Sequence, residues 1–471
     1  MTRASGVVAL ACAAAFGALA AQQRVHDPDL FWHLATAQRT LAEGLVRVDV
    51  FSWSATGTPT TVDQWLGELI IYAAYLAGDW RGIIVVRALA VAVLVGLVVA
   101  NALLARPERP LLAVIAGLPA VFLTRFVWVD RPELLGFAAF AALLVLLRLG
   151  RGGRSWALVA CVPLVALWAN LHGSYAVGVV VALAACVEGA WVDAPRRRMY
   201  ALVAFGVVFG SMLTPAGPGA FFTPGSHFFS PTRDIMEEGV IDVRTQLGAL
   251  YAVTLVLVLA CALAGSAVWP RETVVLVPVV FLSLTALRHA PFLAIAAAPL
   301  LVTRIDEVAR LLWSGITGRA TTRDARPRTA ASRDLPRPAF VGLAGGALAV
   351  LAVAMAAAPP DTDESSYPKE ALAALPRGAG LFNTYDWGGW LIWRAPQTPV
   401  FIDGRLTPYL GRTLDDYRIV VAAAPSWREV VDRRRISALL VRPSDPIAVR
   451  AAELGWRQLA RSEQFVLLVP R

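Results

Sequence analysis

The stretch SWALVACVPLVALWANLHGSYAVGVVVALAACVEGAWV, residues 155–192, decides the fold class. It consists of two apolar runs, 155–170 and 174–192, which are separated by the polar turn Asn170-Leu171-His172-Gly173. Each run is close to the ~20 residues that a helix needs to cross the hydrocarbon core of a membrane. Arginines lie just outside both ends of the stretch. It therefore predicts two antiparallel membrane helices with arginines on one side and the polar turn on the other.

The rest of the chain repeats this pattern. Of its 471 residues, 57% are hydrophobic and only 16% are charged, and the mean hydropathy is +0.60, far above that of soluble globular proteins. We predict a polytopic α-helical membrane protein of about 11 spans, with the N-terminus inside and the first span uncleaved. The other apolar runs are 6–21, 82–104, 111–124, 134–149, 199–214, 246–267, 273–287, 291–303 and 339–358.

The arginines predict the orientation. The inner loops would hold Arg106, Arg109, Arg148, Arg151, Arg154, Arg196, Arg197, Arg198, Arg271 and the basic loop 304–338. This is the positive-inside pattern. The net charge of +9 therefore indicates membrane orientation, and nucleic acid is excluded as a partner. We expect a multi-pass protein of the bacterial cytoplasmic (inner) membrane.

Two segments are predicted outside the spans. In the first outer loop, 22–81, Asp29 is expected to cap a helix from Leu30 to Glu43, with Gly44 as its stop. The loop also holds a small hairpin over 50–62 and a helix over 65–78 that is apolar but too short to span, so we expect it to lie on the membrane.

Residues 359–471 predict a small extracytoplasmic α/β domain, so that 1–358 form the transmembrane domain. The strand-like runs are 400–402, 438–441 and 465–469, and the helix-like runs are 368–375, 427–434 and 446–454. Trp387, Trp390 and Trp393 are expected on the surface of this domain, where they could instead dock it onto the membrane part.

Asp27-Pro28-Asp29 is the sharpest chemical feature. Two carboxylates one residue apart, directly after a span, can act as a general base, bind a divalent cation, or both. The alternative is that Asp29 only caps the following helix while Asp27 is solvated. We predict Asp27 and Asp29 as catalytic residues, and as the metal ligands if a cation is bound.

Arginines at outer loops are candidates for binding phosphate, because the guanidinium fork matches phosphate oxygens. Arg125 and Arg131 lie in one such loop, and Arg288-His289 lies in another. The alternatives are an ion pair with Asp130 that holds the first loop, and lipid-headgroup anchoring by the second. His33, Glu133, Asn170 and His172 are predicted to line the substrate site, the alternative for the last two being a plain polar turn.

In the C-terminal domain, Asp386, Asp403 and Arg405 lie in loops at the ends of apolar runs, and we predict that they bind the acceptor. The alternative is that these loops are turns in which the aspartates satisfy backbone groups and Arg405. The four cysteines lie inside apolar segments, with no metal-type spacing and no disulfide framework.

Several strings in this chain resemble those of a known superfamily. They are Asp27-Pro28-Asp29-Leu30-Phe31-Trp32-His33-Leu34, Trp168-Ala169-Asn170-Leu171-His172-Gly173, Asp386-Trp387-Gly388-Gly389 and Asp403-Gly404-Arg405. With the order of spans and the C-terminal domain, the chain resembles the GT-C integral-membrane glycosyltransferases, including the protein mannosyltransferase and aminoarabinose transferase groups. It also resembles a group of bacterial membrane proteins described only as glycosyltransferase-like.

The resemblance implies transfer of a sugar from a polyprenyl-phosphate donor, with inversion, to a glycan, lipid or protein acceptor. Asp27 or Asp29 would match the superfamily's outer-loop acidic motif, which acts as a base on the acceptor hydroxyl, sometimes with a divalent cation. Because Lys369 is the only lysine, arginine would have to replace any phosphate-binding lysine. The alternatives are a transporter or flippase of a lipid-linked anion, and a non-catalytic envelope assembly factor.

Overall fold

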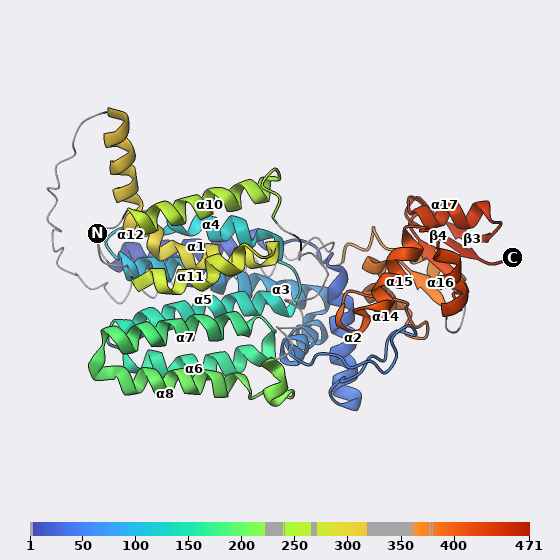
Figure 1. Ribbon diagram of the computed structural model, residues 1–471, viewed down its shortest axis with the longest axis horizontal. Coiled ribbons are helices and arrows are strands. Elements are labelled where there is room, and N and C mark those ends of the chain that lie inside the picture. The colour runs from blue at the N-terminus through green and yellow to red at the C-terminus, as the bar shows by residue number, and fades with distance from the viewer. Residues whose placement is uncertain are drawn as a thin grey trace. The chain divides into compact units, whose positions relative to one another are not determined.

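The computed structural model describes residues 3–221, 239, 241–264, 271–317, 359, 362–375, 378 and 380–471. The chain forms two compact units (Figure 1), of which the first comprises Met1–Gln23 with Ile84–Ala358 and the second comprises Arg24–Ile83 with Pro359–Arg471. The predicted boundary after residue 358 is one of the points where the chain passes between units. The second unit also contains most of the first outer loop. The predicted span 339–358 and residues 318–338 of the basic loop lie outside the described residues.

The first unit is a bundle of helices. Its helices are α1 Arg3–Ala20, the C-terminal part of α3 Trp65–Ala105, α4 Pro110–Thr124, α5 Pro132–Arg151, α6 Ser155–Leu171, α7 Tyr175–Val192, α8 Arg197–Ser211, α10 Gln246–Leu263, α11 Arg271–Ser283 and α12 Ala290–Thr317. Short 3-10 turns occur at η1 Arg125–Val127, η2 Ala194–Arg196, η3 Gly217–Phe221 and η4 Leu287–His289. Every predicted apolar run within the described residues is therefore a helix.

Five of these helices are long and apolar enough to cross a membrane. They are Trp65–Ala105, Pro110–Val127, Pro132–Arg151, Tyr175–Val192 and Gln246–Leu263, and shorter apolar helices cover Ser5–Ala20, Ser155–Leu171 and Val274–Ser283. This count covers the described part of the chain alone. The total of about 11 spans and the sidedness of the bundle stay predictions.

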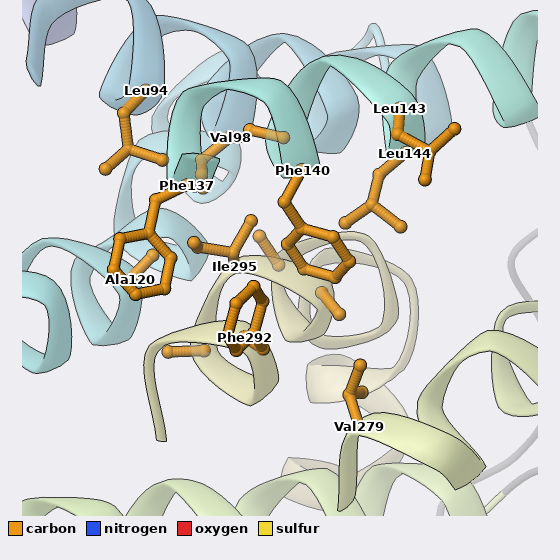
Figure 2. Close-up of a cluster of buried hydrophobic side chains, with 14 of the residues drawn as sticks. Leu94, Val98, Ala120, Phe137, Phe140, Leu143, Leu144, Val279, Phe292 and Ile295 are labelled. Carbon is orange, nitrogen blue, oxygen red and sulfur yellow. The ribbon is translucent and has the colours of Figure 1, made fainter. Parts of the chain in front are cut away.

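The core of the bundle lies around α12. Residues 290–302 of this helix are all buried. Figure 2 shows Phe292 of α12 between Phe137 and Phe140 of α5, with ring centroids 4.9 and 5.0 Å apart respectively. Such aromatic pairs add to the free energy gained by burying apolar area. A helix that is enclosed by other helices is stabilised by the packing of its side chains. This explains why so short an apolar run forms a helix here.

The arginine-rich links meet at one end of this bundle. Arg148 Nε donates to Asn101 Oδ1 at 2.6 Å, which joins the end of α5 to the end of α3. Arg151 pairs with Glu188 of α7 at 2.6 Å, and Arg196 Nη1 donates to the Gly150 carbonyl at 2.8 Å. The basic ends of α3, α5 and α7 therefore lie together, and the side of a membrane that they face stays a prediction.

The N-terminal part of the second unit begins with α2, Pro28–Glu43. The predicted helix and its stop are confirmed, since Gly44 ends the helix at φ 93°. The predicted cap is wrong, because the N-cap is Asp27: its side chain accepts the backbone N–H of Asp29. Proline at the first helical position needs no such partner and starts the helix two residues early.

The two other elements predicted in this loop are present. Val48 bridges Pro59 in an antiparallel pair, so the hairpin lies over 47–60 rather than over the predicted 50–62. The helix that begins at Trp65 breaks at Gly78 and Asp79, where the backbone angles are not helical, and resumes as the apolar part of α3. Whether residues 65–77 lie on a membrane surface stays a prediction.

The C-terminal part of the second unit is a four-stranded sheet with helices, which confirms the predicted α/β class. The strands are β1 Leu381–Asn383, β2 Ala438–Val441, β3 Arg457–Arg461 and β4 Val466–Val469, in the order β1-β2-β4-β3. β1 and β2 are parallel and the other pairs are antiparallel. The helices are α14 Gly388–Arg394, α15 Arg412–Val421, α16 Trp427–Arg434 and α17 Pro446–Glu453, with 3-10 turns η5 Lys369–Ala374, η6 Tyr385–Trp387 and η7 Thr407–Tyr409.

Two predictions for this domain are wrong. The run 400–402 is not a strand of the sheet, because Val400 exchanges backbone hydrogen bonds with Phe51 and Trp53 of the outer loop. Trp387 and Trp390 are not on the surface. Both are buried, and their indole N–H groups donate to the Ser366 carbonyl and to Glu364.

We expect Glu364 to stabilise the folded protein at neutral pH and to lose this effect in acid. Burial raises its pKa, but hydrogen bonds from Arg394, Trp390 and Thr362 outweigh burial, so the pKa lies below its ordinary value. The carboxylate therefore stabilises the fold fully above about pH 4.3, the usual glutamate pKa, and less as pH falls through the lower folded value. We expect Glu364→Gln to lower the unfolding midpoint at pH 7 and to flatten its fall in acid, measured by thermal unfolding in detergent from pH 3 to 7. Parallel curves for the two proteins would contradict this.

Candidate functional site

The two candidate catalytic carboxylates differ in their surroundings. Asp27 is 2% exposed, and its Oδ1 accepts the Asp29 backbone N–H at 2.9 Å. It therefore has a capping role at the start of α2. Asp29, in the first turn of that helix, is partly exposed. Of the two aspartates, Asp29 is the more exposed.

Asp29 lies against the Asp403-Gly404-Arg405 loop. A methyl group at Gly404 would lie 1.7 Å from Asp29 Oδ1 and 3.2 Å from Trp32 Nε1, so only glycine fits there. Trp32 is 6% exposed, and its indole N–H is buried without a hydrogen-bond partner among the described residues. A buried donor of this kind is costly unless something accepts from it. The Asp29 carboxylate and the indole N–H of Trp32 thus both lie beside Gly404.

The loop itself is held by a buried charge network. The Arg405 side chain is 7% exposed and makes two hydrogen bonds to Asp403, at 2.8 and 2.6 Å. It also pairs with Asp49 Oδ1 at 2.7 Å, and both aspartates are 0% exposed. Tyr409 donates its hydroxyl to Asp403. Asp403 and Arg405 were predicted to bind the acceptor, and the structure places them in a buried network of the kind given as the alternative.

Electrostatics keep this network in one protonation state. Burial alone would lower the pKa of Arg405, but Asp403, Tyr409 and Asp49 raise it well above its ordinary value. Burial and the Asp403 charge raise the pKa of Tyr409 well above its ordinary value. Arg405 therefore stays charged and Tyr409 stays protonated through the physiological range.

His33 lies one turn further along α2. Its Nδ1 is 3.0 Å from Glu68 Oε1, and both side chains are almost fully buried, at 3% and 5% exposure. This contact joins α2 to the first part of α3 within the second unit. The predicted role of His33 in lining the site is untested, and Glu68 is a partner that the sequence did not suggest.

Asp386 is the accessible residue of the C-terminal set. Its carboxylate pairs with Arg442 at 2.6 Å, and the two side chains are 52% and 43% exposed. An exposed pair of this kind contributes little to stability. It is open to a substrate, unlike Asp403.

In the first unit, the predicted polar clusters gather at the end of the bundle opposite the basic loops. We call this end, formed by Gln23, 124–133, 170–175 and 284–289, the polar end. Gly136 at the start of α5 faces Ser174, since a methyl group there would lie 2.5 Å from Ser174 Oγ. Asn170 Nδ2 donates to the Leu213 carbonyl at 2.9 Å, which adds the end of α8. Phe137 meets Phe292, which adds the start of α12.

The predicted phosphate-binding arginines of the first outer loop have defined neighbours at the polar end. Arg125 is exposed, donates to Gln23 Oε1 at 3.1 Å and lies 5.2 Å over the Trp128 ring. Arg131 is partly exposed at the residue preceding α5, and Glu133 is partly exposed in the first turn of that helix. Asp130, the partner considered for these arginines, pairs with Arg87 of α3.

The Arg87–Asp130 pair is buried, with its side chains 1% and 0% exposed and Nη1 2.6 Å from Oδ2. Arg87 also donates to the carbonyls of Ala21 and Gln23. It thus fastens the end of α1 and the α4–α5 link to α3. Arg87 was not among the residues predicted from the sequence, although a lone arginine inside the apolar run 82–104 indicates a buried partner.

At the polar end, Asn170, His172 and His289 form hydrogen bonds with backbone carbonyls or with hydroxyl groups. His172 Nδ1 lies 2.9 Å from Ser174 Oγ, and Asn170 also donates to the Ala166 carbonyl. His289 Nδ1 lies 2.9 Å from Thr285 Oγ1 in the link between α11 and α12. Burial and the neighbouring Arg288 lower the pKa of His289 to about 4, so its imidazole is neutral at pH 7. Arg288 is the permanent positive charge of this link.

The described residues offer no preformed metal centre. They contain no group of three or more His, Cys, Asp or Glu side chains placed to hold a metal ion. Asp27 and Asp29 could supply two carboxylates, and Mg²⁺ is usually bound by one or two carboxylates together with substrate phosphates and water. No step of the chemistry below is derived through a metal.

No protein-family model and no curated protein matches the sequence. Solved structures do match. ArnT from Cupriavidus metallidurans in the apo state has a TM-score of 0.51 at 14% identity, over 99% of this chain and 97% of that chain. The same protein bound to undecaprenyl phosphate gives a TM-score of 0.53 at the same identity and coverage.

A third match comes from an archaeal enzyme. The Archaeoglobus fulgidus oligosaccharyltransferase tethered with an acceptor peptide has a TM-score of 0.54 at 11% identity, over 92% of this chain and 68% of that chain. This chain has the GT-C fold. The GT-C fold covers nearly the whole chain in the ArnT comparisons, and thus both units described above. The predicted resemblance is confirmed at the level of fold.

Proposed function

We propose that the protein is a glycosyltransferase that moves a sugar from a polyprenyl-phosphate donor to an envelope glycan, lipid or protein acceptor. The reaction takes place on the outer face of the bacterial inner membrane. Support comes from the GT-C fold, which this chain shares with ArnT, a protein solved with undecaprenyl phosphate. The observation that carries the proposal is the partly exposed Asp29 carboxylate at the start of α2.

Asp29 is the general base in this proposal. The acceptor hydroxyl gives its proton to the Asp29 carboxylate as its oxygen attacks the anomeric carbon of the donor sugar. The bond from that carbon to the phosphate oxygen breaks, the electron pair leaves with polyprenyl phosphate, and the sugar inverts. Asp27 keeps the first turn of α2 in place through its hydrogen bond to the Asp29 N–H. A positioned base contributes roughly 10²–10⁴-fold to such a step.

Arg125, Arg131 and Arg288 of the polar end bind the phosphate of the donor. Charge builds on this phosphate as the sugar leaves, and a well-placed donor can contribute ~3–4 kcal/mol to the transition state. His289, neutral at pH 7, can hydrogen-bond the phosphate without adding charge. Asn170, His172 and Glu133 lie at the same polar end and line the site, and Asp386 with Arg442 is open to the acceptor.

The arginine assignment predicts weaker binding of the lipid phosphate. Replacing Arg125, Arg131 or Arg288 by alanine should each lower the affinity for undecaprenyl phosphate by roughly 10- to 100-fold, since a charged hydrogen bond contributes about 1.5–3 kcal/mol. Binding to purified protein can be followed by native mass spectrometry. Arg106→Ala, whose side chain is 46% exposed on the α3–α4 link, is the matched control and should bind as the wild type does. Equal losses in all four variants would contradict the assignment.

A further inference from the structure

Three glycines of the C-terminal domain make close contacts that no larger residue allows. A methyl group at Gly404 would collide with Asp29, and one at Gly389 would lie 2.6 Å from the Pro28 carbonyl oxygen. At Gly388 it would lie 2.1 Å from the Ile402 carbonyl oxygen. All these contacts are within the second unit. Through them, the start of α14 and the 402–405 loop press directly on the first turn of α2.

The 402–405 loop is in turn fixed from behind. Arg405 joins Asp403 to Asp49 of the outer loop, and Tyr409 closes the network on Asp403. Asn383 Nδ2 also donates to the Ile402 carbonyl at 2.8 Å. Because Asp49 and Asp403 are completely buried, the network has no face from which a substrate could be bound. The geometry of the network is that of a support, with Gly404 at its tip.

We propose that the Ile402–Arg405 loop, held by Asp49 and Tyr409, positions the Asp29 carboxylate, with Gly404 as the residue that sets its place. This inference rests on the proposed function of Asp29 as the base. It assigns to Gly404, Arg405 and Asp49 a positioning role in place of acceptor binding.

The test measures the Asp29 carboxylate directly, without the reaction. Purified protein in detergent is treated with a water-soluble carbodiimide and an amine, and labelling of the Asp29 peptide is quantified by mass spectrometry. Gly404→Ala should change the labelling rate of Asp29 several-fold, because the added methyl group displaces the carboxylate. Asp49→Asn, which adds no volume and loosens Arg405, should change it in the same direction. Gly219→Ala is the control, since nothing lies within 4 Å of that exposed glycine.

Sugar transfer by the purified protein, with the donor and acceptor that the cell comparison identifies, gives the second readout. Displacing a catalytic group by about 1 Å can cost roughly 10²-fold, so Gly404→Ala should lower kcat by that order with KM for the acceptor little changed. Combined with Asp29→Asn, it should cause no further loss. Unchanged labelling in folded Gly404→Ala and Asp49→Asn proteins would overturn the positioning role, as would a rise in KM alone. Altered labelling with full activity of Asp29→Asn would instead refute the proposed function and leave the positioning standing.

Discussion

Asp29→Asn is expected to reduce sugar transfer by roughly 10²–10⁴-fold, because the amide cannot take the proton of the acceptor hydroxyl. Asp27→Asn should cost much less, since asparagine caps a helix about as well as aspartate does. Each variant is returned to a strain that lacks the gene, and the glycosylated product is quantified by mass spectrometry. The fold should survive in both, because Asn is close to Asp in size.

Glu43→Gln is the matched control for this pair. Glu43 is the last residue of the same helix, and its side chain is 58% exposed in an ion pair with Arg39. Neutralising this carboxylate should therefore leave sugar transfer unchanged. Equal losses from Asp27→Asn and Asp29→Asn would contradict the division of roles between the two aspartates. Full transfer by the Asp29→Asn protein would favour a transporter of a lipid-linked anion, or an assembly factor, over the enzyme.

Arg87→Met is expected to destabilise the first unit by about 3–5 kcal/mol, because it leaves the Asp130 carboxylate buried without its counter-charge. Asp130 is 3% exposed, and Arg87 also holds the carbonyls of Ala21 and Gln23. The free energy of unfolding can be measured in detergent micelles against a denaturing detergent.

Two further variants separate charge burial from simple loss of a contact. The double variant Arg87→Met/Asp130→Leu should recover part of the loss, since an apolar pair carries no desolvation cost. Arg39→Met breaks an exposed pair and should change the free energy by less than about 1 kcal/mol. A loss of that small size for Arg87→Met would show that Asp130 is not buried in the folded protein.

The helices of the bundle could be predicted from the sequence because each is an apolar run with basic or polar links at its ends. The run 291–303, for example, is short for a span, yet it forms the start of α12, where all its neighbours are apolar helices. In contrast, the run 400–402 looks like a strand from its composition alone. Its partner is the outer loop more than 340 residues earlier, and no local pattern reports such a pairing.

The candidate site could be predicted in its residues but not in their roles. The aspartate pair was identified by its position after the first apolar run. The structure, however, makes Asp27 the N-cap residue, because the helix begins at Pro28. Asp403 and Arg405 stood out as loop residues, and it took their burial and the distant Asp49 to reveal a supporting network. Nothing in the sequence around Glu68 or Trp32 pointed to a role for them, because that role depends on which groups the fold places beside them.

The most direct measurement is a mass-spectrometric comparison of polyprenyl-phosphate sugars and envelope glycans in cells with and without this gene. Cells lacking the gene are expected to lose one glycan residue and to accumulate the matching lipid-linked sugar. The wild-type gene should reverse both changes, and the Asp29→Asn gene should reverse neither. Unchanged lipid-linked sugars and glycans in the cells without the gene would contradict the proposed transferase.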